Sequence, residues 1–158
     1  MKRSEFVLAA GSLALFGLLL RPAKAAQAYE VTHSDSEWRT LLGPERYEIL
    51  RQGGTEPAFS SQLIAEKRSG IYRCAGCSLV LFSSKYKYDS GDGWPSFWDV
   101  MPNATRTQAD YALVEQRTEV HCRRCGGHLG HIFDDGPAPT HLRYCIDGLA
   151  LRFVPGSA

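Results

Sequence analysis

Residues 122–133 of the 158-residue chain read Cys-Arg-Arg-Cys-Gly-Gly-His-Leu-Gly-His-Ile-Phe. The segment opens with a C-x-x-C pair, continues with two glycines and then places two histidines three residues apart. A second pair, Cys74-Ala75-Gly76-Cys77, lies 44 residues upstream. Two such pairs that converge surround one ion with four thiolates, which is the tetrahedral site of structural zinc. The sequence predicts one structural Zn²⁺ bound by Cys74, Cys77, Cys122 and Cys125.

The 44-residue gap is longer than the usual zinc-ribbon gap of about 15–20 residues. It predicts a body of structure between the two pairs, because loop closure costs little more as a loop lengthens. Two alternatives remain open. The pairs form disulfides if the protein is exported, or they bind iron, which accepts the same ligands.

The fifth cysteine, Cys145, has no partner within these pairs. It lies in Arg143-Tyr144-Cys145-Ile146-Asp147, where a strand would place Arg143 and Cys145 on the same face. A nearby guanidinium favours the thiolate, which is the nucleophilic form. We therefore expect Cys145 to be a reactive nucleophile, the alternative being a buried and inert thiol.

The N-terminus is typical of an export signal over residues 1–25. A basic start at Lys2 and Arg3 precedes an apolar run of 15 residues, Phe6 to Leu20, and cleavage is expected after Ala25 or Ala28. The run is short for a permanent membrane span, which needs about 20 residues. We expect export to a bacterial periplasm, by the twin-arginine or the general secretory route, and no stable span after cleavage. The alternative is an N-terminal membrane anchor.

Charge excludes one class of partner. Four basic residues and one acidic residue give residues 1–25 a net charge of +3, so the rest of the chain, out of +1 in total, carries −2. A nearly neutral domain lacks the basic surface that nucleic acid requires. The length suits a single domain, predicted to span residues 36–154, after a linker at 26–35 and before a tail at 155–158.

The pattern of residues 36–154 predicts a mainly β domain. Short helices are expected at 36–42 and from Pro44 to about Arg51, ending at Gly53-Gly54. Strands are expected at 71–74, 78–82, within 111–120 and within 143–154, separated by turns rich in glycine and proline. Many short strands with such turns are typical of antiparallel sheets.

Several blocks stand in register with a known family. They are Thr55-Glu56-Pro57, Gly93-Trp94-Pro95-Ser96-Phe97, the segment 122–133, Asp134-Asp135-Gly136-Pro137, and Arg143-Tyr144-Cys145-Ile146. In order and spacing they resemble the methionine-R-sulfoxide reductases, the MsrB family, over about residues 36–154. The resemblance implies a β-tent fold of two antiparallel sheets with the zinc distal to the active site. It also implies reduction of methionine-R-sulfoxide in peptides and proteins.

The resemblance assigns roles to individual residues. It implies Cys145 as the nucleophile that becomes a sulfenic acid, His131 as the proton donor, and Asp135 and Arg143 as groups that orient and polarise the site. It implies a substrate-binding role for three further residues: Trp94, His128 and Phe133. Plainer alternatives remain open for most of these residues. The two histidines form a second metal site or are structural, and Trp94 is a core residue. Asp135 is a surface charge and Arg143 a salt-bridge partner.

The chain departs from the family at two positions. Many members carry a second redox cysteine just before the Gly-Trp-Pro block, where this chain has Asp92. This predicts a one-cysteine enzyme whose sulfenic acid is reduced by an external donor, a thioredoxin-like protein or another thiol. Asp147 stands where the family usually has asparagine. It would raise the pKa of Cys145 if both charges lie close together, or it would bind Arg143 or accept a proton.

Three rival functions are kept open by the residues alone. The cysteine pairs also suit a non-catalytic zinc-ribbon binding module, which would leave Cys145 without a purpose. They suit an iron-based electron carrier, which would be coloured. A cysteine with histidines also suits thiol-dependent acyl transfer.

Overall fold

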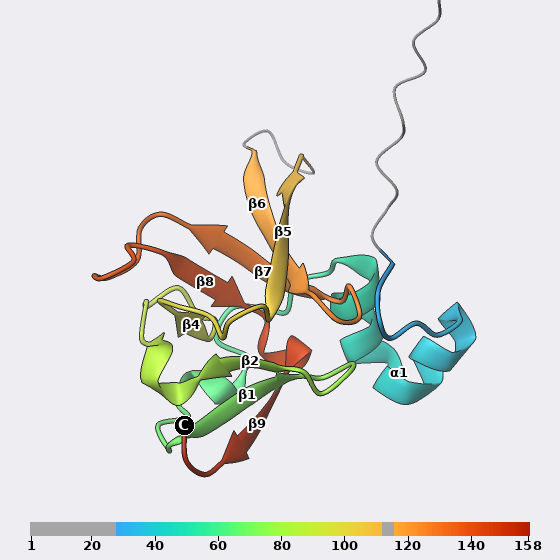
Figure 1. Ribbon diagram of the computed structural model, residues 1–158, viewed down its shortest axis with the longest axis horizontal. Helices are drawn as coiled ribbons and strands as arrows, with labels where there is room; N and C mark the ends of the chain where they lie inside the picture. Colours follow the sequence, from blue (N-terminus) through green and yellow to red (C-terminus); the bar gives the residue numbers. More distant parts are fainter. Residues whose placement is uncertain (1–27, 112–115) are drawn as a thin grey trace, which may run out of the picture.

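The computed structural model describes residues 28–111 and 116–158, which form two antiparallel β-sheets and one helix (Figure 1). The mainly β architecture with two sheets is therefore confirmed. The predicted export signal at residues 1–25 lies outside the described residues. Within the part of the chain that the structure describes, no helix is long and apolar enough to cross a membrane.

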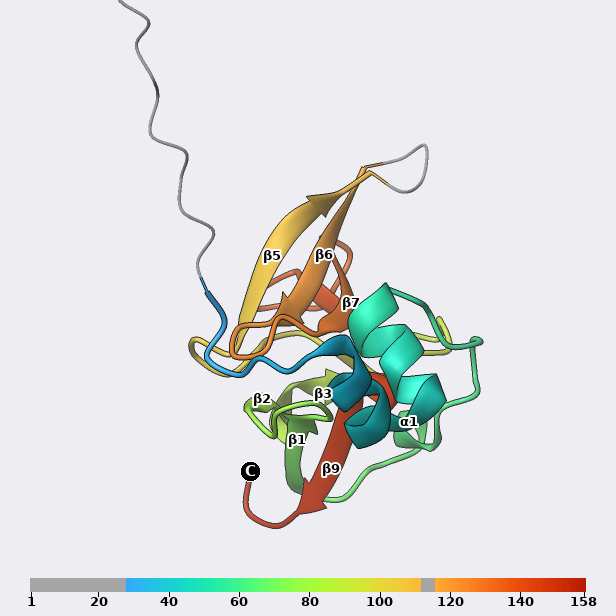
Figure 2. The ribbon, with the colours of Figure 1, turned by 90° about the vertical axis from the view of Figure 1, so that its right-hand side faces the viewer.

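Helix α1, Asp35–Gln52, consists of two helical segments joined at a kink. Ser34 begins it with a capping box, in which its hydroxyl accepts from the backbone of Glu37 and the Glu37 carboxylate accepts from the backbone of Ser34. Gly43 leaves helical geometry at φ 71°, and Pro44 starts the second segment, so the predicted pair of short helices is confirmed. The helix packs against β7 and η3 at one side of the molecule (Figure 2).

The smaller sheet has the strand order β2-β1-β9. Its strands are β1, Gly70–Cys74, β2, Val80–Ser83, and β9, Leu151–Pro155. The larger sheet has the order β3-β4-β8-β7-β6-β5. Its strands are β3, Lys87–Tyr88, β4, Ser96–Phe97, β5, Thr105–Asp110, β6, Arg117–Cys122, β7, His128–Phe133, and β8, Arg143–Ile146.

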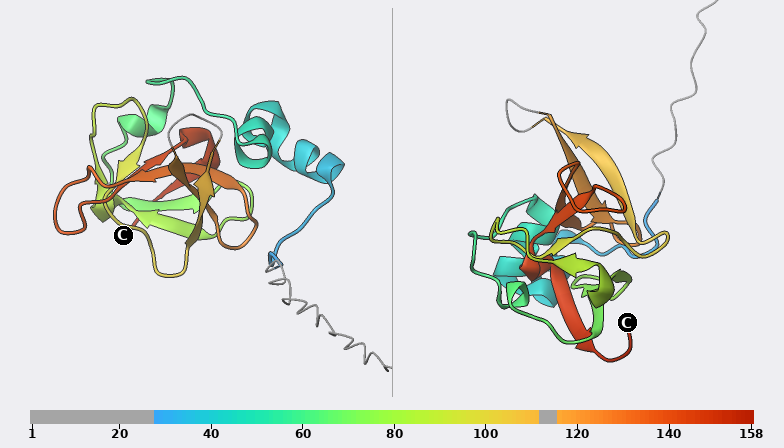
Figure 3. Two further views of the ribbon diagram at one scale, coloured as in Figure 1. Left: turned by 90° about the horizontal axis from the view of Figure 1, so that it is seen from above. Right: turned by 90° about the vertical axis from the view of Figure 1, so that its left-hand side faces the viewer.

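Three short 3₁₀ helices connect these strands: η1, Gln62–Ile64, η2, Ser84–Tyr86, and η3, Gly148–Ala150. The small sheet lies on one side of the molecule and the β5–β6 hairpin extends from the other (Figure 3). Aromatic rings join the sheets: Phe82 stacks on Phe97 at a centroid distance of 4.3 Å, and Tyr72 meets Phe97 edge-on at 4.9 Å. All three are fully buried, so this cluster is the core on which β4 and β8 rest.

The structure corrects the strand predictions in two places. The expected strand within 143–154 is divided by η3, so that β8 belongs to the large sheet and β9 to the small one. Strand β5 was not predicted, because its sequence Thr-Arg-Thr-Gln-Ala-Asp is polar and largely exposed. It is held by full antiparallel pairing with β6. Residues 112–115 of the expected strand within 111–120 lie outside the described residues.

Strand β7 also was not predicted, and one glycine controls its pairing with β8. Gly130 has φ 144°, and a Cβ added there would lie 2.1 Å from the carbonyl oxygen of Cys145. No real side chain fits at that separation, so β8 can approach β7 closely only beside glycine.

We expect Gly130→Ala to lower the free energy of unfolding by about 3 kcal/mol, through strain and overpacking. Gly53→Ala is the matched control, since Gly53 also has positive φ but faces open space; it should cost about 1 kcal/mol. Chemical denaturation measures both. Equal losses would show that the close approach of β8 to residue 130 carries no energy.

Candidate functional site

The four cysteines of the two pairs converge. The Sγ atoms of Cys74 and Cys125 lie 3.7 Å apart, those of Cys77 and Cys122 lie 3.5 Å apart, and all four lie within 4.8 Å of one another. A tetrahedral ion with metal–sulfur bonds of about 2.3 Å separates its sulfurs by about 3.8 Å. The thiols are free rather than paired in disulfides. The cluster therefore fits a single metal ion and does not support the disulfide alternative.

Both cysteine pairs adopt the same knuckle. Ser78 has φ 61° and its N–H donates to the carbonyl of Cys74 at 2.9 Å, while Gly126 has φ 69° and its N–H donates to the carbonyl of Cys122 at 2.8 Å. Arg51 of α1 donates to the carbonyl of Cys125 at 3.0 Å. The second knuckle is therefore fixed from two sides immediately before β7 begins.

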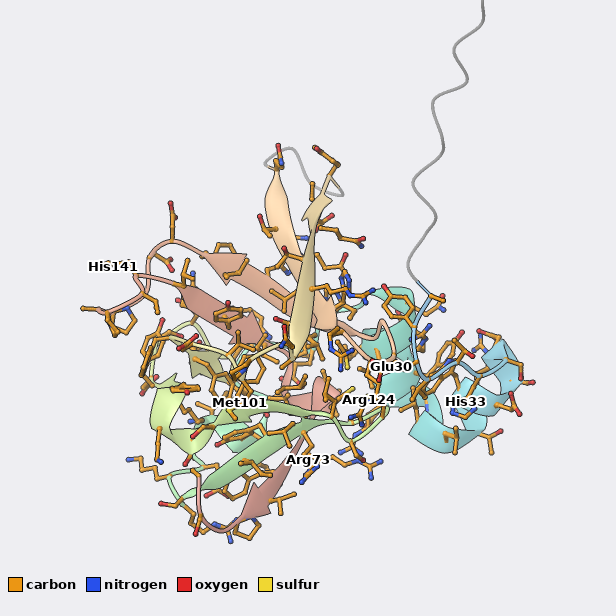
Figure 4. All side chains as sticks on the ribbon, in the orientation of Figure 1. Glu30, His33, Arg73, Met101, Arg124 and His141 are labelled. Atoms are coloured by element: carbon orange, nitrogen blue, oxygen red, sulfur yellow. The ribbon has the colours of Figure 1, made fainter. Side chains whose placement is uncertain are left out.

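The metal-binding knuckle and the β7–β8 loop lie at opposite ends of the large sheet. Arg124, inside the second knuckle, lies close to Glu30 near α1, whereas His141 of the loop lies at the far side of the molecule (Figure 4). Strands β7 and β8 run between these ends. The site described next lies along them.

Cys145 occupies the middle of the large sheet. In strand register it stands opposite His131 of β7 on one side and Ser96 of β4 on the other. Directly opposed residues of neighbouring strands share a face, with Cβ atoms about 5 Å apart. The thiol is half-buried. The fold thus brings the unpaired cysteine beside one of the two predicted histidines.

The electrostatic surroundings of Cys145 favour the neutral thiol. Burial raises its pKa to about 11, and the carboxylates of Asp92 and Asp147 add to the rise, while the guanidinium of Arg143 opposes it. Arg143 therefore does not outweigh these effects, which corrects the expectation of a resting thiolate. Nucleophilic attack requires a base that removes the proton as the sulfur reacts.

Arg143 is held by two carboxylates and a ring. Its Nε and Nη2 donate to the two oxygens of Asp135 at 2.7 Å each, and Nη1 forms an ion pair with Asp92. The guanidinium carbon lies 4.4 Å from the ring centroid of Phe133. Hydrogen bonds from Arg143 lower the pKa of Asp135. Asp135 is therefore an orienting partner of Arg143 rather than an isolated surface charge.

His131 is held from the β5–β6 hairpin. Its Nε2 lies 2.9 Å from Oδ2 of Asp110, which also accepts from Arg117 at 2.7 Å. Burial lowers the pKa of His131, so the ring is neutral at neutral pH. With the Asp110 carboxylate as acceptor, Nε2 carries the hydrogen and Nδ1 remains free to exchange a proton.

His128 lies between two carboxyl groups and is only 6% exposed. Its Nδ1 lies 2.7 Å from Oε1 of Glu119, and its Nε2 lies 3.8 Å from Oδ2 of Asp147. Nε2 makes no hydrogen bond to any described residue. The ring meets His131 edge-on at a centroid distance of 5.5 Å. His128 therefore supports His131 from within the sheet, and both its nitrogens face carboxyl groups.

Asp147 is buried, at 3% exposed, and joins three segments. Its Oδ1 accepts from the backbone N–H of Glu56 at 2.8 Å. Glu56 in turn accepts from the N–H groups of Gly148 and Leu149, at 2.6 and 3.0 Å. Burial raises the pKa of Asp147 to about 6. Asp147 does not bind Arg143, which was one of the expected outcomes.

Trp94 is half-buried, and its indole N–H donates to the carbonyl of Glu56 at 3.1 Å. The preceding Gly93 has φ 94°, and a Cβ there would lie 2.9 Å from that of Ala58. The indole is therefore fixed, with part of its ring accessible. The cavity of about 900 Å³ between α1, η1 and β9 is not lined by Cys145, His131 or Trp94.

The structure therefore groups the predicted residues as one site and adds to them. Cys145, His131, Arg143, Asp135 and Phe133 share the face of β7 and β8. Sequence reasoning missed the carboxylates that hold them, because these come from distant segments. They are Asp92, Asp110 and Glu119, with Glu56 behind Asp147. One sequence feature could have pointed to Glu119. It is a charged residue in the strand that leads to Cys122, one of the four clustered cysteines.

Comparison with known proteins shows which family this chain resembles. The SelR domain family matches residues 42–155. A peptide methionine sulfoxide reductase MsrB of Leptospira interrogans is 52% identical over 126 residues, covering 79% of this chain and 96% of that protein. Proteins of the same description from Methanosarcina barkeri and Thiobacillus denitrificans are 51% and 50% identical, covering 78% and 77% of this chain and 87% and 93% of theirs.

We expect Asp92→Asn to lower the pKa of the Cys145 thiol, because the Asp92 carboxylate raises it. Alkylation of Cys145 by iodoacetamide at neutral pH should become about threefold faster, as the thiolate fraction increases. Asp89→Asn is the matched control, since it removes an equal charge from the same loop and Asp89 is not among the main causes of the raised pKa of Cys145. An unchanged pH profile of alkylation in Asp92→Asn would contradict the assignment.

Proposed function

Because the chain belongs to the MsrB family of peptide methionine sulfoxide reductases, we propose that it reduces the R epimer of methionine sulfoxide in peptides and proteins, with Cys145 as the nucleophile. The observation that carries this proposal is the strand register that sets Cys145 directly opposite His131. Among the described residues this is the thiol outside the metal-binding cluster. The family reaction needs such a thiol beside a group that can move a proton.

The proposed reaction transfers one oxygen between two sulfurs. The sulfur of Cys145 attacks and gains the oxygen, the S–O bond of the sulfoxide breaks, and methionine leaves. Cys145 is oxidised by two electrons to a sulfenic acid and the methionine sulfur is reduced by two. The proton of the original thiol ends on the sulfenic oxygen, so the step balances without an outside acid.

His131 is suited to carry that proton. Its Nε2 is engaged by Asp110, so Nδ1 accepts the proton of the Cys145 thiol and returns it to the sulfoxide oxygen. A thiol with a pKa of about 11 needs such a base. The neutral resting state of His131, favoured by burial, is the state that can accept. This assigns His131 as base and then acid, a wider role than proton donor.

The proposed substrate-binding surface consists of Arg143 and the rings of Trp94 and Phe133. The guanidinium, anchored by Asp135, polarises the sulfoxide oxygen, and the rings of Trp94 and Phe133 contact the methyl-sulfur end of the side chain.

Recycling is proposed to need an external thiol. Position 92 holds an aspartate, and the other four thiols lie together in the metal-binding cluster. A donor thiol condenses with the sulfenic acid to a mixed disulfide and releases water, and a second donor thiol then frees Cys145. A thioredoxin-like protein or a small thiol fits this role, as a one-cysteine mechanism requires.

The metal is proposed to be zinc with a structural role. Four thiolates in two knuckles suit Zn²⁺ in a closed tetrahedral site, where it cross-links the fold and takes no part in the reaction. We further propose that residues 1–25 direct export to the periplasm, that a linker at 26–35 follows, and that 36–154 form the catalytic domain. An uncleaved N-terminal anchor is the alternative outcome.

We expect Cys145→Ser to reduce turnover of methionine-R-sulfoxide to less than a few per cent of wild type, because a hydroxyl is a far weaker nucleophile than a thiol. The metal content and melting temperature should not change. A stereospecific assay on R and S dabsylated methionine sulfoxide with a dithiol measures turnover. Equal turnover of both epimers by wild type, or a fully active serine variant, would overturn the proposal.

Cys74→Ser should instead lose the metal and most of the stability of the fold, because binding of structural zinc contributes about 10–16 kcal/mol to folding in small zinc domains. Metal analysis and thermal unfolding measure both effects, with Cys145→Ser as the matched control that removes a thiol outside the cluster. Full zinc occupancy in Cys74→Ser would refute the ligand assignment.

A further inference from the structure

A buried carboxyl group faces an unpartnered imidazole nitrogen beneath the proposed site. Oδ2 of Asp147 lies 3.8 Å from Nε2 of His128, and the two side chains are 3% and 6% exposed. That separation is longer than a hydrogen bond, and a shift of about 1 Å would close it. Nε2 has no other hydrogen-bond partner among the described residues, so Asp147 is the group placed to satisfy it.

The opposite side of the ring decides where the hydrogens lie. Nδ1 of His128 contacts Glu119 at 2.7 Å. Burial acts to raise the pKa of Glu119, but hydrogen bonds from His128 and Gln108 outweigh burial and lower it. Glu119 is therefore an ionised acceptor, and Nδ1 of His128 carries the hydrogen. With the hydrogen on Nδ1, the Nε2 atom offers a lone pair, which a donor would satisfy.

Asp147 can donate only while it holds a proton. Its other oxygen, Oδ1, already accepts from the backbone of Glu56, which leaves Oδ2 for the O–H. An ionised Asp147 would set two lone-pair atoms against each other in a buried place, which is costly. The neutral acid instead satisfies both groups.

The charges around Asp147 favour the neutral form. Glu56, from the loop before η1, acts to raise the pKa of Asp147, and His128 of β7 acts to lower it. The Asp147 charge acts to raise the pKa of the Cys145 thiol on β8, and the Arg143 guanidinium acts to lower it. With burial as the largest cause, the pKa of Asp147 rises to about 6.

We infer that Asp147 is a positioning residue that works as a protonated carboxyl: it donates a hydrogen bond to Nε2 of His128 and thereby holds the ring against which His131 packs. This rests on the proposed function and deepens it, since His131 is the proposed proton carrier. The ring contact at a centroid distance of 5.5 Å transmits the effect. The contribution of Asp147 to the site is therefore expected to be largest at pH values where Asp147 keeps its proton.

Asp147→Asn tests this directly, because its amide keeps the shape and donates permanently at the same place. The ratio of kcat/KM of the variant to that of wild type should be close to 1 near pH 5. It should reach about 10 near pH 7, since one unit above a pKa of about 6 only about a tenth of Asp147 keeps its proton. Groups common to both proteins cancel in this ratio. A ratio that stays flat across this range overturns the inference.

Asp147→Leu removes the donor while retaining bulk, and it should be slow at every pH. A leucine variant as active as Asn would show that residue 147 does not act through His128. If the leucine variant fails to fold, the Asn ratio still decides.

Two readouts do not depend on turnover, and they separate failure of this inference from failure of the proposed function. Folding raises the pKa of Asp147, so wild type gains stability from the neutral carboxyl below about pH 4 and loses it as the pH rises through about 6. The melting temperature of wild type should fall relative to that of Asp147→Asn over this window. Nitrogen-15 NMR of His128 Nε2 should shift near pH 6 in wild type and not in the variant. Parallel melting curves or a pH-independent Nε2 signal in wild type would refute the ionisation itself.

Discussion

A cluster of four thiols is the constraint from which the rest of the structure extends. Cys74 ends β1 in the small sheet, and Cys122 ends β6 in the large sheet, yet their sulfurs lie within 4.8 Å. One metal ion there would tie the two sheets together at the point where β7 starts. Helix α1 supports the same place through the hydrogen bond from Arg51 to the carbonyl of Cys125. The paired strands that carry His131 and Cys145 extend from this cluster.

The close pairing of β7 and β8 places the residues of the candidate site beside one another. Gly130 lets the backbones approach, and the register then sets Cys145 against His131. Cross-strand neighbours in a sheet have little freedom to separate, so the thiol and the imidazole keep a fixed position relative to each other, which the proposed proton transfer requires. A site placed on strands, with carboxylates from adjoining elements behind it, is more precise than one placed on loops.

Burial and neighbouring charges act differently on each ionisable group of the site. Burial keeps Cys145 as a thiol in the resting protein, which protects it from indiscriminate oxidation, since the thiolate is the reactive form. Arg143 is restrained by Asp135 and Asp92 on the same face of the sheet as Cys145. The buried carboxyl of Asp147 lies behind this face. Each charged group therefore has a partner that limits where it can act.

Short-range features could be derived from the chain alone. The C-x-x-C spacing predicted the cluster of four thiols that fits a metal ion, because knuckle geometry depends on contacts within about four residues. The kink before Pro44 and the cap at Ser34 are local in the same sense. The motif blocks likewise singled out Cys145 and His131 as candidate site residues, since their order and spacing are visible without a fold.

Partners from distant segments required the tertiary structure. Glu56 and Asp147 are 91 residues apart, and Asp110 and His131 are 21 apart. No local sequence pattern therefore predicts either contact. The polar strand β5 forms because β6 pairs with it, not because its residues prefer a strand. The protonation of Cys145 also depended on the fold: a guanidinium two residues away suggested a thiolate, but burial prevailed, together with the carboxylates of the neighbouring Asp147 and the distant Asp92. Charge states depend on everything packed around a group, and only the folded chain defines those surroundings.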